Sequence, residues 1–225
     1  MKEGKLIVID GIDGAGKATQ VALLVKRLKR RRIKAQGLDF PQYETFFGRL
    51  VTEYLKGDFG TLDPKVASLL YGANRLEFKD KISNWLKGGY TVVLNRYVSS
   101  NQIHQAANIE SKKQRRLFVK WIAKMEYGNF GLPMPDLILF LNLPAEVSYQ
   151  QVLKKTTKAR KYIAGTKRDI LESDLEHQRR ALKQAHEALK SYGPKSKIVE
   201  CFDKQLLSKQ EIGDKIWQHV SKLIK

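Results

Sequence analysis

The sequence is poor in cysteine and in acidic residues, and it has no long apolar run. A single cysteine, Cys201, excludes both an internal disulfide and a cysteine-built metal site. No apolar run approaches the roughly 20 residues that a membrane helix needs. The N-terminus lacks the basic, apolar and small-residue pattern of a secretory signal. We therefore expect a soluble protein of the reducing cytoplasm, with no membrane partner.

The shortage of acidic residues leaves a strongly basic chain. There are 23 Asp and Glu residues against 42 Lys and Arg residues, which gives a formal charge of +19 at pH 7. Such an excess favours partners that carry phosphate, whether nucleic acid, an anionic membrane or nucleotides. Charge alone does not choose among these three classes.

Five short apolar runs indicate strands, and longer stretches of helical character separate them. The runs cover residues 6–10, 35–40, 91–95, 137–143 and 197–202. With 225 residues and 42% hydrophobic content, the chain suits one medium domain, which we assign to residues 1–225. The alternation predicts an α/β fold, in which a five-stranded parallel sheet is covered by helices on both faces.

Several polar segments are expected to be exposed. The basic stretch 154–168 predicts a mobile loop between helices, and residues 170–189 read as one helix with many polar positions. The arginines at 30–32 indicate the solvated end of the first helix, because cations favour a helix C-terminus. We also expect solvated helix positions for His177, His186 and His219.

The first predicted strand runs directly into a glycine-rich loop. Residues 11–17 read Gly-Ile-Asp-Gly-Ala-Gly-Lys, and an amphipathic helix follows. Glycines allow backbone N–H groups to converge on phosphate oxygens, and the helix dipole adds attraction for an anion. The context predicts a nucleotide site built from Gly11, Ile12, Asp13, Gly14, Ala15, Gly16, Lys17, Ala18 and Thr19.

Position 18 departs from this motif. A Ser or Thr hydroxyl normally follows the lysine and binds Mg²⁺, but here the residue is Ala18. Either water replaces that ligand, or the nucleotide itself holds most of the metal. Thr19 could contact the α-phosphate or merely cap and pack the start of the helix, and the sequence leaves both roles open.

Further segments along most of the chain resemble the thymidylate kinases. The matching features are Asp13 in the loop, Phe40-Pro41 with Tyr43 and Gly48, and the segments 69–75, 95–105, 135–147 and 168–174. The resemblance implies a P-loop NTPase-like three-layer sandwich with a lid at about residues 154–169. It also implies transfer of a phosphoryl group from ATP to dTMP, a Mg²⁺ cofactor and a homodimer that uses helices beside the acceptor site.

The same resemblance assigns residues to the acceptor nucleotide. Tyr71 would stack on the thymine ring, Arg75 would donate to a thymine carbonyl, and Phe40 would line this pocket. A tyrosine among helical leucines is also typical of a core residue, which is the competing interpretation of Tyr71. The full predicted acceptor site is Asp13, Phe40, Pro41, Tyr43, Tyr71, Arg75, Arg96, Ser100, Asn101, His104 and Gln105.

Other assignments concern the sugar, the phosphate and the base edge. By resemblance, Arg96 would bind the acceptor phosphate, and Asp13 would lie on the side of the 3′-hydroxyl. Asn101 and Gln105 would contact the base edge or its waters. His104 stands where several relatives have a tyrosine near the ribose 2′ position, so it would help to favour deoxyribose.

The reaction itself needs cations rather than a base. The acceptor phosphate is already an anion at pH 7, so catalysis consists of in-line positioning and neutralisation of charge. By the resemblance, Lys17, Asp13 and Arg96 are the predicted catalytic residues, and the lid supplies a further cation. Arg160 is the first choice for that cation, with Lys161 and Arg168 as the alternatives.

Four departures from the family pattern weaken the metal or nucleotide environment. They are Ala18, Asn95 and Asn142, which replace hydroxyl or acidic residues, and Gln151, which replaces an arginine beside adenine. Two other functions therefore stay open. One is a kinase for a different nucleoside monophosphate, such as dUMP or dGMP, and the other is a noncatalytic nucleotide or nucleic-acid binder. The leading interpretation involves no specific nucleic acid.

Overall fold

The computed structural model of the chain describes residues 3–154, 174–191 and 194–224. Five parallel strands form the main sheet in the order β2-β3-β1-β4-β5. They are β1 (Lys5–Gly11), β2 (Ala35–Asp39), β3 (Thr91–Asn95), β4 (Leu137–Asn142) and β5 (Ser196–Glu200). β1 occupies the centre, and it pairs with β3 on one side and with β4 on the other. The predicted α/β class and parallel sheet are confirmed.

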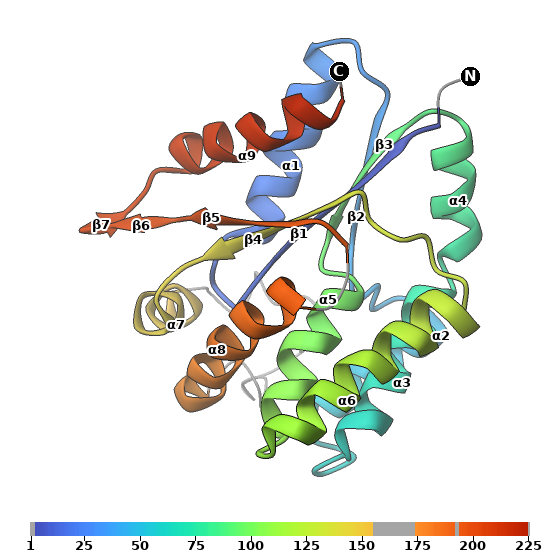
Figure 1. Cartoon of the computed structure of the whole chain (residues 1–225), viewed down its shortest axis with the longest axis vertical. Helices are drawn as coiled ribbons and strands as arrows, with labels where there is room; N and C mark the ends of the chain where they lie inside the picture. Colours follow the sequence, from blue (N-terminus) through green and yellow to red (C-terminus); the bar gives the residue numbers. More distant parts are fainter. Residues whose placement is uncertain (1–2, 155–173, 192–193, 225) are drawn as a thin grey trace.

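Helices cover both faces of this sheet (Figure 1). The longer ones are α1 (Lys17–Arg30), α2 (Phe46–Lys56), α3 (Pro64–Leu76), α4 (Lys79–Lys87), α6 (Lys112–Ala123), α7 (Ala145–Leu153), α8 (Leu175–Ser191) and α9 (Lys209–Leu223). Shorter turns are α5 (Val98–Ser100), η1 (Asn101–Gln105), η2 (Ala106–Asn108) and η3 (Lys124–Asn129). No helix in the described ranges is both long and apolar enough to cross a membrane.

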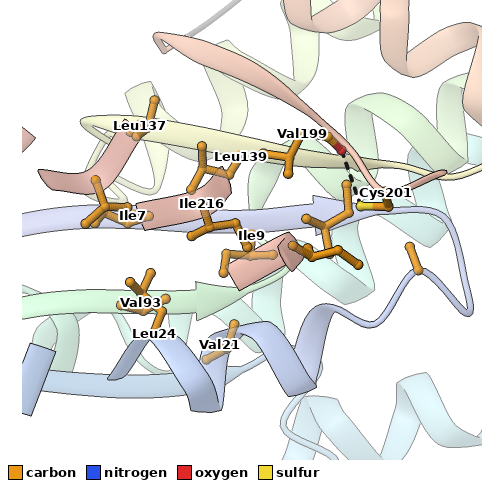
Figure 2. Packing of buried hydrophobic residues seen from close by; sticks show 14 of the residues in the cluster. Ile7, Ile9, Val21, Leu24, Val93, Leu137, Leu139, Val199, Cys201 and Ile216 are labelled. Atoms are coloured by element: carbon orange, nitrogen blue, oxygen red, sulfur yellow. Dashed lines mark hydrogen bonds between the residues drawn. The ribbon is translucent and has the colours of Figure 1, made fainter. Parts of the chain in front are cut away.

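The central strand supplies both halves of the core, because successive side chains of a strand point to opposite faces. Ile7 and Ile9 pack with α1 and α9, as Figure 2 shows, and Cys201 closes the same cluster. Leu6 and Val8 pack on the opposite face, with residues of α4 and α6. Burial on both faces explains why β1 reads as a continuous apolar run.

Two sequence predictions are wrong at their boundaries. The run 197–202 is not one strand: β5 ends at Glu200, and β6 (Phe202–Asp203) turns back onto β7 (Gln205–Leu206) in an antiparallel pair. The helix predicted over 170–189 is not continuous, because Asp174 is not helical and α8 begins at Leu175; residues 170–173 lie outside the described residues. The Asp174 carboxylate accepts from the backbone N–H of His177 at 2.9 Å, and this capping bond defines the helix start.

Candidate functional site

A cavity of about 670 Å³ lies along the carboxyl edge of the sheet. In open parallel sheets, this edge is where ligands bind. The loop after β1 forms one end of the cavity, and residues of α3 and η1 form the other. All predicted site residues within the described ranges line it except Gly11 and Ile12. The predicted lid cations Arg160, Lys161 and Arg168 lie outside the described residues.

The loop has the backbone geometry of a phosphate cradle. Gly14 and Gly16 have φ angles of 91° and 87°, in the left-handed region that favours glycine, and α1 begins at Lys17. The Lys17 ammonium donates to the carbonyl oxygens of Gly11 and Ile12 at 2.9 and 2.8 Å. Gly11 and Ile12 therefore position the lysine side chain through their carbonyl oxygens.

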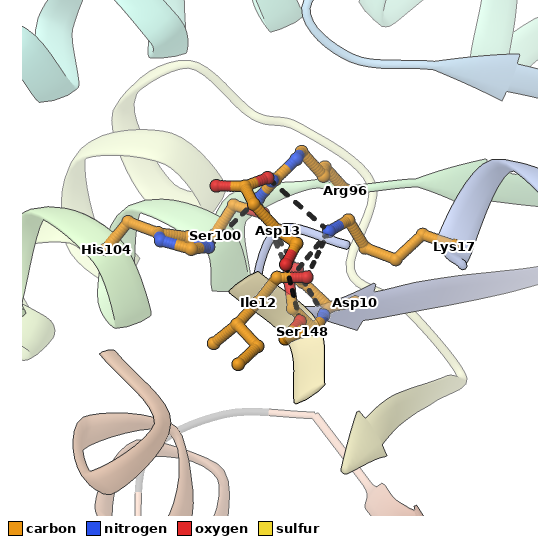
Figure 3. A network of polar contacts seen from close by, with 9 residues as sticks. Asp10, Ile12, Asp13, Lys17, Arg96, Ser100, His104 and Ser148 are labelled. Atoms are coloured by element: carbon orange, nitrogen blue, oxygen red, sulfur yellow. Dashed lines mark hydrogen bonds and ion pairs between the residues drawn. The ribbon is translucent and has the colours of Figure 1, made fainter. Parts of the chain in front are cut away.

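Asp13 links the loop to the end of β3. Its Oδ1 accepts from Arg96 Nη2 and lies 3.8 Å from Lys17 Nζ, so one carboxylate faces two cations (Figure 3). Arg96 has a φ of 63°, and its backbone N–H donates to the Ile9 carbonyl at 3.1 Å. Burial opposes its charge, but the attraction of Asp13 and Asp10 outweighs it and raises the pKa of Arg96 above its ordinary value.

A second carboxylate, Asp10, links the loop to the residues that follow β3, and the sequence analysis did not identify it. Asp10 is fully buried and accepts hydrogen bonds from Ser99 Oγ at 2.6 Å and from the Gly11 N–H at 2.9 Å. Ser100 Oγ donates to the same carboxylate at 2.9 Å. Ser148 of α7 also donates to the Asp13 carbonyl. The loop is thus fixed by residues from three different elements.

His104 lies beside Arg96 in the cavity. Its Nε2 is 3.0 Å from Arg96 Nη1 and must accept, because a guanidinium can only donate. Burial, together with the nearby Arg96 charge, holds the pKa of His104 well below its ordinary value, so the ring is neutral. His104 lines the cavity, and its role at the acceptor sugar stays a prediction.

His177 is not the solvated residue that we predicted. It is 2% exposed, stacks on His104 with ring centroids 5.9 Å apart, and its Nδ1 lies 3.1 Å from Asn108 Oδ1. Burial lowers the pKa of His177 as well. The polar pattern of α8 gave no signal for this contact, because it arises from the packing of α8 on η1.

The far end of the cavity carries the residues expected to read a base. Tyr71 is half-buried and meets Tyr54 edge-on, with ring centroids 6.3 Å apart. Arg75 is buried at 2% exposure and makes a bidentate ion pair with Glu126, at 2.6 and 2.8 Å. Asn101 also donates to Glu126, at 2.9 Å. Sequence analysis did not identify Glu126, which is fully buried.

The metal environment contains few acidic groups. The described residues include no group of three or more His, Cys, Asp or Glu side chains that could hold a metal ion. Ala18, Asn95 and Asp39 line the cavity together, and Asp39 lies opposite Asn95 in the strand register. Burial raises the pKa of Asp39, and a hydrogen bond with Asn95 partly offsets this effect. Asn95 Oδ1 is buried and has no partner among the described residues.

The chain is similar in sequence to the thymidylate kinases. A sequence model of the thymidylate kinase family matches residues 9–212. The thymidylate kinase of Plasmodium falciparum (isolate 3D7) is 34% identical over 143 residues, which cover 64% of this chain and 63% of the relative. That of Schizosaccharomyces pombe is 36% identical over 145 residues, 64% of each chain. The matched segment thus spans slightly less than two thirds of the length of these relatives.

The similarity to thymidylate kinases extends over more of the chain when structures are compared. The structure of the Candida albicans thymidylate kinase superposes with a TM-score of 0.71 at 26% sequence identity. It covers 98% of this chain and 92% of the other. The sheet order and the helices on its faces are therefore those of a P-loop NTPase-like fold.

Proposed function

The chain belongs to the thymidylate kinase family, and on this premise we propose that it transfers the γ-phosphoryl group of ATP to dTMP, giving dTDP and ADP. The observation that carries the proposal is that one continuous cavity contains both predicted nucleotide sites. It joins the phosphate cradle around Lys17 to the pocket around Tyr71 and Arg75, with the Asp13–Arg96 pair between them. A donor and an acceptor nucleotide in this cavity would meet at that pair.

The residues of the cavity can supply the required electrostatics. The loop N–H groups and the start of α1 bind donor phosphates, and Lys17 neutralises charge on the β- and γ-phosphates. Arg96 binds the acceptor phosphate, and its contacts with Asp13 and His104 fix the guanidinium. Because these groups are oriented before the reaction, little reorganisation is needed when charge spreads over the transferred group.

The proposal also assigns residues to the deoxyribose of dTMP and a cation to the lid. Asp13 and His104 lie beside Arg96, where the deoxyribose of a bound dTMP would be placed between phosphate and base. We assign the lid cation to Arg160, with Lys161 and Arg168 as alternatives. An arginine that arrives with a closing lid would act mainly in the transition state.

We further propose Mg²⁺ as the metal, brought in with ATP. The donor set suits this ion, because Mg²⁺ usually keeps several waters and binds through one or two carboxylates plus substrate phosphates. Asp13 and Asp39 are the acidic side chains that line the cavity. When bound, the ion supplies positive charge to the β- and γ-oxygens. Because the methyl group of Ala18 cannot bind a metal, water or the nucleotide phosphates would replace the hydroxyl that usually follows the lysine.

The remaining parts of the proposal concern the ligand class, the cellular location and the oligomeric state. We infer nucleotides rather than nucleic acid as its ligands, a cytoplasmic location and a homodimer. Support for the homodimer comes from a row of exposed apolar side chains on α3, namely Val66, Leu69 and Leu76, and from Leu117 on the neighbouring α6. Lys65 of α3 lies over the Trp121 ring of α6, which places the two helices together.

A coupled assay of ADP release with each nucleoside monophosphate tests the proposed reaction. We expect dTMP to give the highest kcat/KM of the panel. No turnover with dTMP at millimolar concentration would contradict the proposal. A higher kcat/KM with dUMP or dGMP would identify a different monophosphate kinase, and salt-sensitive oligonucleotide binding without phosphoryl transfer would identify a noncatalytic binder.

A further inference from the structure

Glu126 holds two residues of the acceptor pocket at once. Its Oε2 accepts from Arg75 Nε at 2.6 Å, and its Oε1 accepts from Arg75 Nη2 at 2.8 Å and from Asn101 Nδ2 at 2.9 Å. All three residues are at most 2% exposed. Arg75 and Asn101 line the cavity, whereas Glu126 does not, so the carboxylate acts on a ligand only through its two partners.

Three elements bring these residues together. Arg75 lies on α3, Asn101 begins the π-helical turn η1, and Glu126 lies in the π-helical turn η3. Gly72 faces this cluster: a Cβ atom at this position would be tight only against the Phe130 ring, at 3.1 Å, and in ordinary contact with Met125 and the Glu126 carboxyl carbon, at 3.5 and 3.6 Å. Single π-turns occur frequently at functional sites.

The acceptors around Asn101 determine which way its amide points. Its NH₂ group donates to the Ser68 carbonyl at 3.1 Å and to Glu126. Both neighbours can only accept, so the nitrogen must face them, and Oδ1 is left as the available polar atom. Asn101 therefore offers the cavity an acceptor.

Arg75 offers the opposite polarity. A guanidinium has five N–H donors, and the bidentate pair with Glu126 uses its Nε and one Nη2 hydrogen. No acceptor for the other donors occurs among the described residues. The wall of the pocket thus presents a fixed donor beside a fixed acceptor.

We propose that Glu126 is a positioning residue that sets this donor–acceptor pattern and thereby the choice of pyrimidine. A 4-oxo, 3-NH edge, as in thymine and uracil, complements a donor from Arg75 and an acceptor from Asn101. Cytosine carries an amino donor at position 4 and an acceptor at N3, so both contacts would be mismatched. The inference rests on the proposed function, because it assumes that the acceptor nucleotide occupies this end of the cavity.

The variant Glu126→Gln tests the inference. A glutamine amide has one accepting and one donating end, whereas both partners of residue 126 are donors, so one of the two loses its restraint. We expect the ratio of kcat/KM for dTMP to that for dCMP to fall about tenfold or more, mainly through KM for dTMP. Glu110→Gln makes the same substitution at an exposed position and should leave the ratio unchanged.

A second variant covers the case in which Glu126→Gln does not fold. Glu126→Asp keeps the charge opposite Arg75 but is one methylene shorter, so one carboxylate no longer reaches both partners. We expect it to fold and to lose part of the same discrimination. An unchanged dTMP to dCMP ratio in either folded variant would overturn the inference.

Calorimetric titration of the wild-type protein with dTMP and with dCMP separates this inference from the proposed reaction. Selective dTMP binding without turnover would contradict the reaction and support the pocket assignment. Equal affinity for dTMP and dCMP would overturn the inference even if dTMP were a substrate.

Discussion

Lys17 shows how a short motif can determine a residue's surroundings. Its ammonium lies over carbonyl oxygens of the same loop, at 2.8–2.9 Å, and beside the Asp13 carboxylate. All of these contacts are made within seven residues, so the spacing Gly11 to Lys17 was enough to predict the position of the charge. The lysine is 7% exposed and lines the cavity.

Replacement of Lys17 by alanine removes the cation that we assign to the β- and γ-phosphates. We expect Lys17→Ala to lower kcat by about 10²–10³, the loss found when one preorganised group is removed from a charged transition state. The measurement is the coupled ADP assay with ATP and dTMP. Lys29→Ala removes an exposed lysine from the same helix and should retain wild-type kcat. Near-normal turnover of Lys17→Ala would contradict the loop assignment.

Glu126 illustrates what the residue pattern could not reveal. It lies 51 positions from Arg75 and 25 from Asn101, in a stretch that carries no motif. Only the packing of α3, η1 and η3 brings the three side chains together. An acidic residue that is fully buried is uncommon, but burial itself is known only from the structure.

At the scale of elements, the loop and α7 constrain each other. A Cβ atom on Gly14 would lie 2.3 Å from the Ser148 carbonyl oxygen, whereas one on Gly16 would meet nothing within 4 Å. Both glycines have positive φ angles, so backbone strain is common to the two positions. The difference between them comes from the neighbouring helix.

We therefore expect unequal effects from alanine at these two positions. Gly16→Ala should lower the free energy of unfolding by about 1–2 kcal/mol, the cost of a left-handed backbone conformation for alanine. Gly14→Ala should lose about 1–3 kcal/mol more, because the carbonyl backbone of α7 must move. Urea unfolding of both variants measures this difference, and equal losses would show that α7 does not restrain the loop.

The contact between η1 and α8 gives the protein a dependence on pH. His104 and His177 have folded-state pKa values below the ordinary 6.5, so they stay neutral in the fold and become protonated in the unfolded chain as pH falls. The unfolded state then binds more protons, and stability decreases with decreasing pH. Below about pH 6.5, each histidine lowers the free energy of unfolding by up to about 1.4 kcal/mol for each pH unit of acidification.

Urea unfolding at pH 7.5, 6.5 and 5.5 measures this dependence. His104→Gln preserves an acceptor for Arg96 but cannot titrate, so we expect a smaller loss of stability between pH 6.5 and 5.5 than in the wild type. His186→Gln, at a ring that packs edge-on against Phe140, serves as the matched control. A wild-type slope in His104→Gln would contradict the assignment of a buried neutral histidine.

At the scale of the whole molecule, the exposed apolar row on α3 and α6 predicts self-association. We expect light scattering after size-exclusion chromatography to give twice the chain mass of 25.8 kDa. Leu69→Glu combined with Leu117→Glu should give a monomer, because both side chains are about half exposed in the single chain. Leu23→Glu changes an exposed leucine on α1, across the sheet, and should leave the dimer intact. A wild-type monomer at micromolar concentration would contradict the prediction.

The net charge of +19 is only partly explained by phosphate binding. The basic residues that line the cavity are Lys17, Arg75, Arg96, Lys154 and Lys209, but most basic residues of the described ranges lie elsewhere. The arginines at 30–32 are exposed at the end of α1, as the sequence predicted, but two arginines near this end also contact α9. Arg27 and Arg31 lie 4.6 and 4.8 Å from the centre of the Trp217 ring, and Arg27 also pairs with Asp214 of α9 at 2.6 Å. Part of the excess charge thus joins α1 to α9.

The sequence by itself determined the features that depend on neighbouring residues. Short apolar runs that alternate with helical stretches predicted the five parallel strands, and the glycine spacing predicted the phosphate loop. Both patterns reflect the local backbone geometry of the residues that carry them. The tertiary structure decided which side chains restrain the site. Asp10 with Ser99, His104 with His177, and Arg75 with Glu126 are separated by 51 to 89 positions. Such pairs depend on strand register and helix packing, which no local pattern encodes.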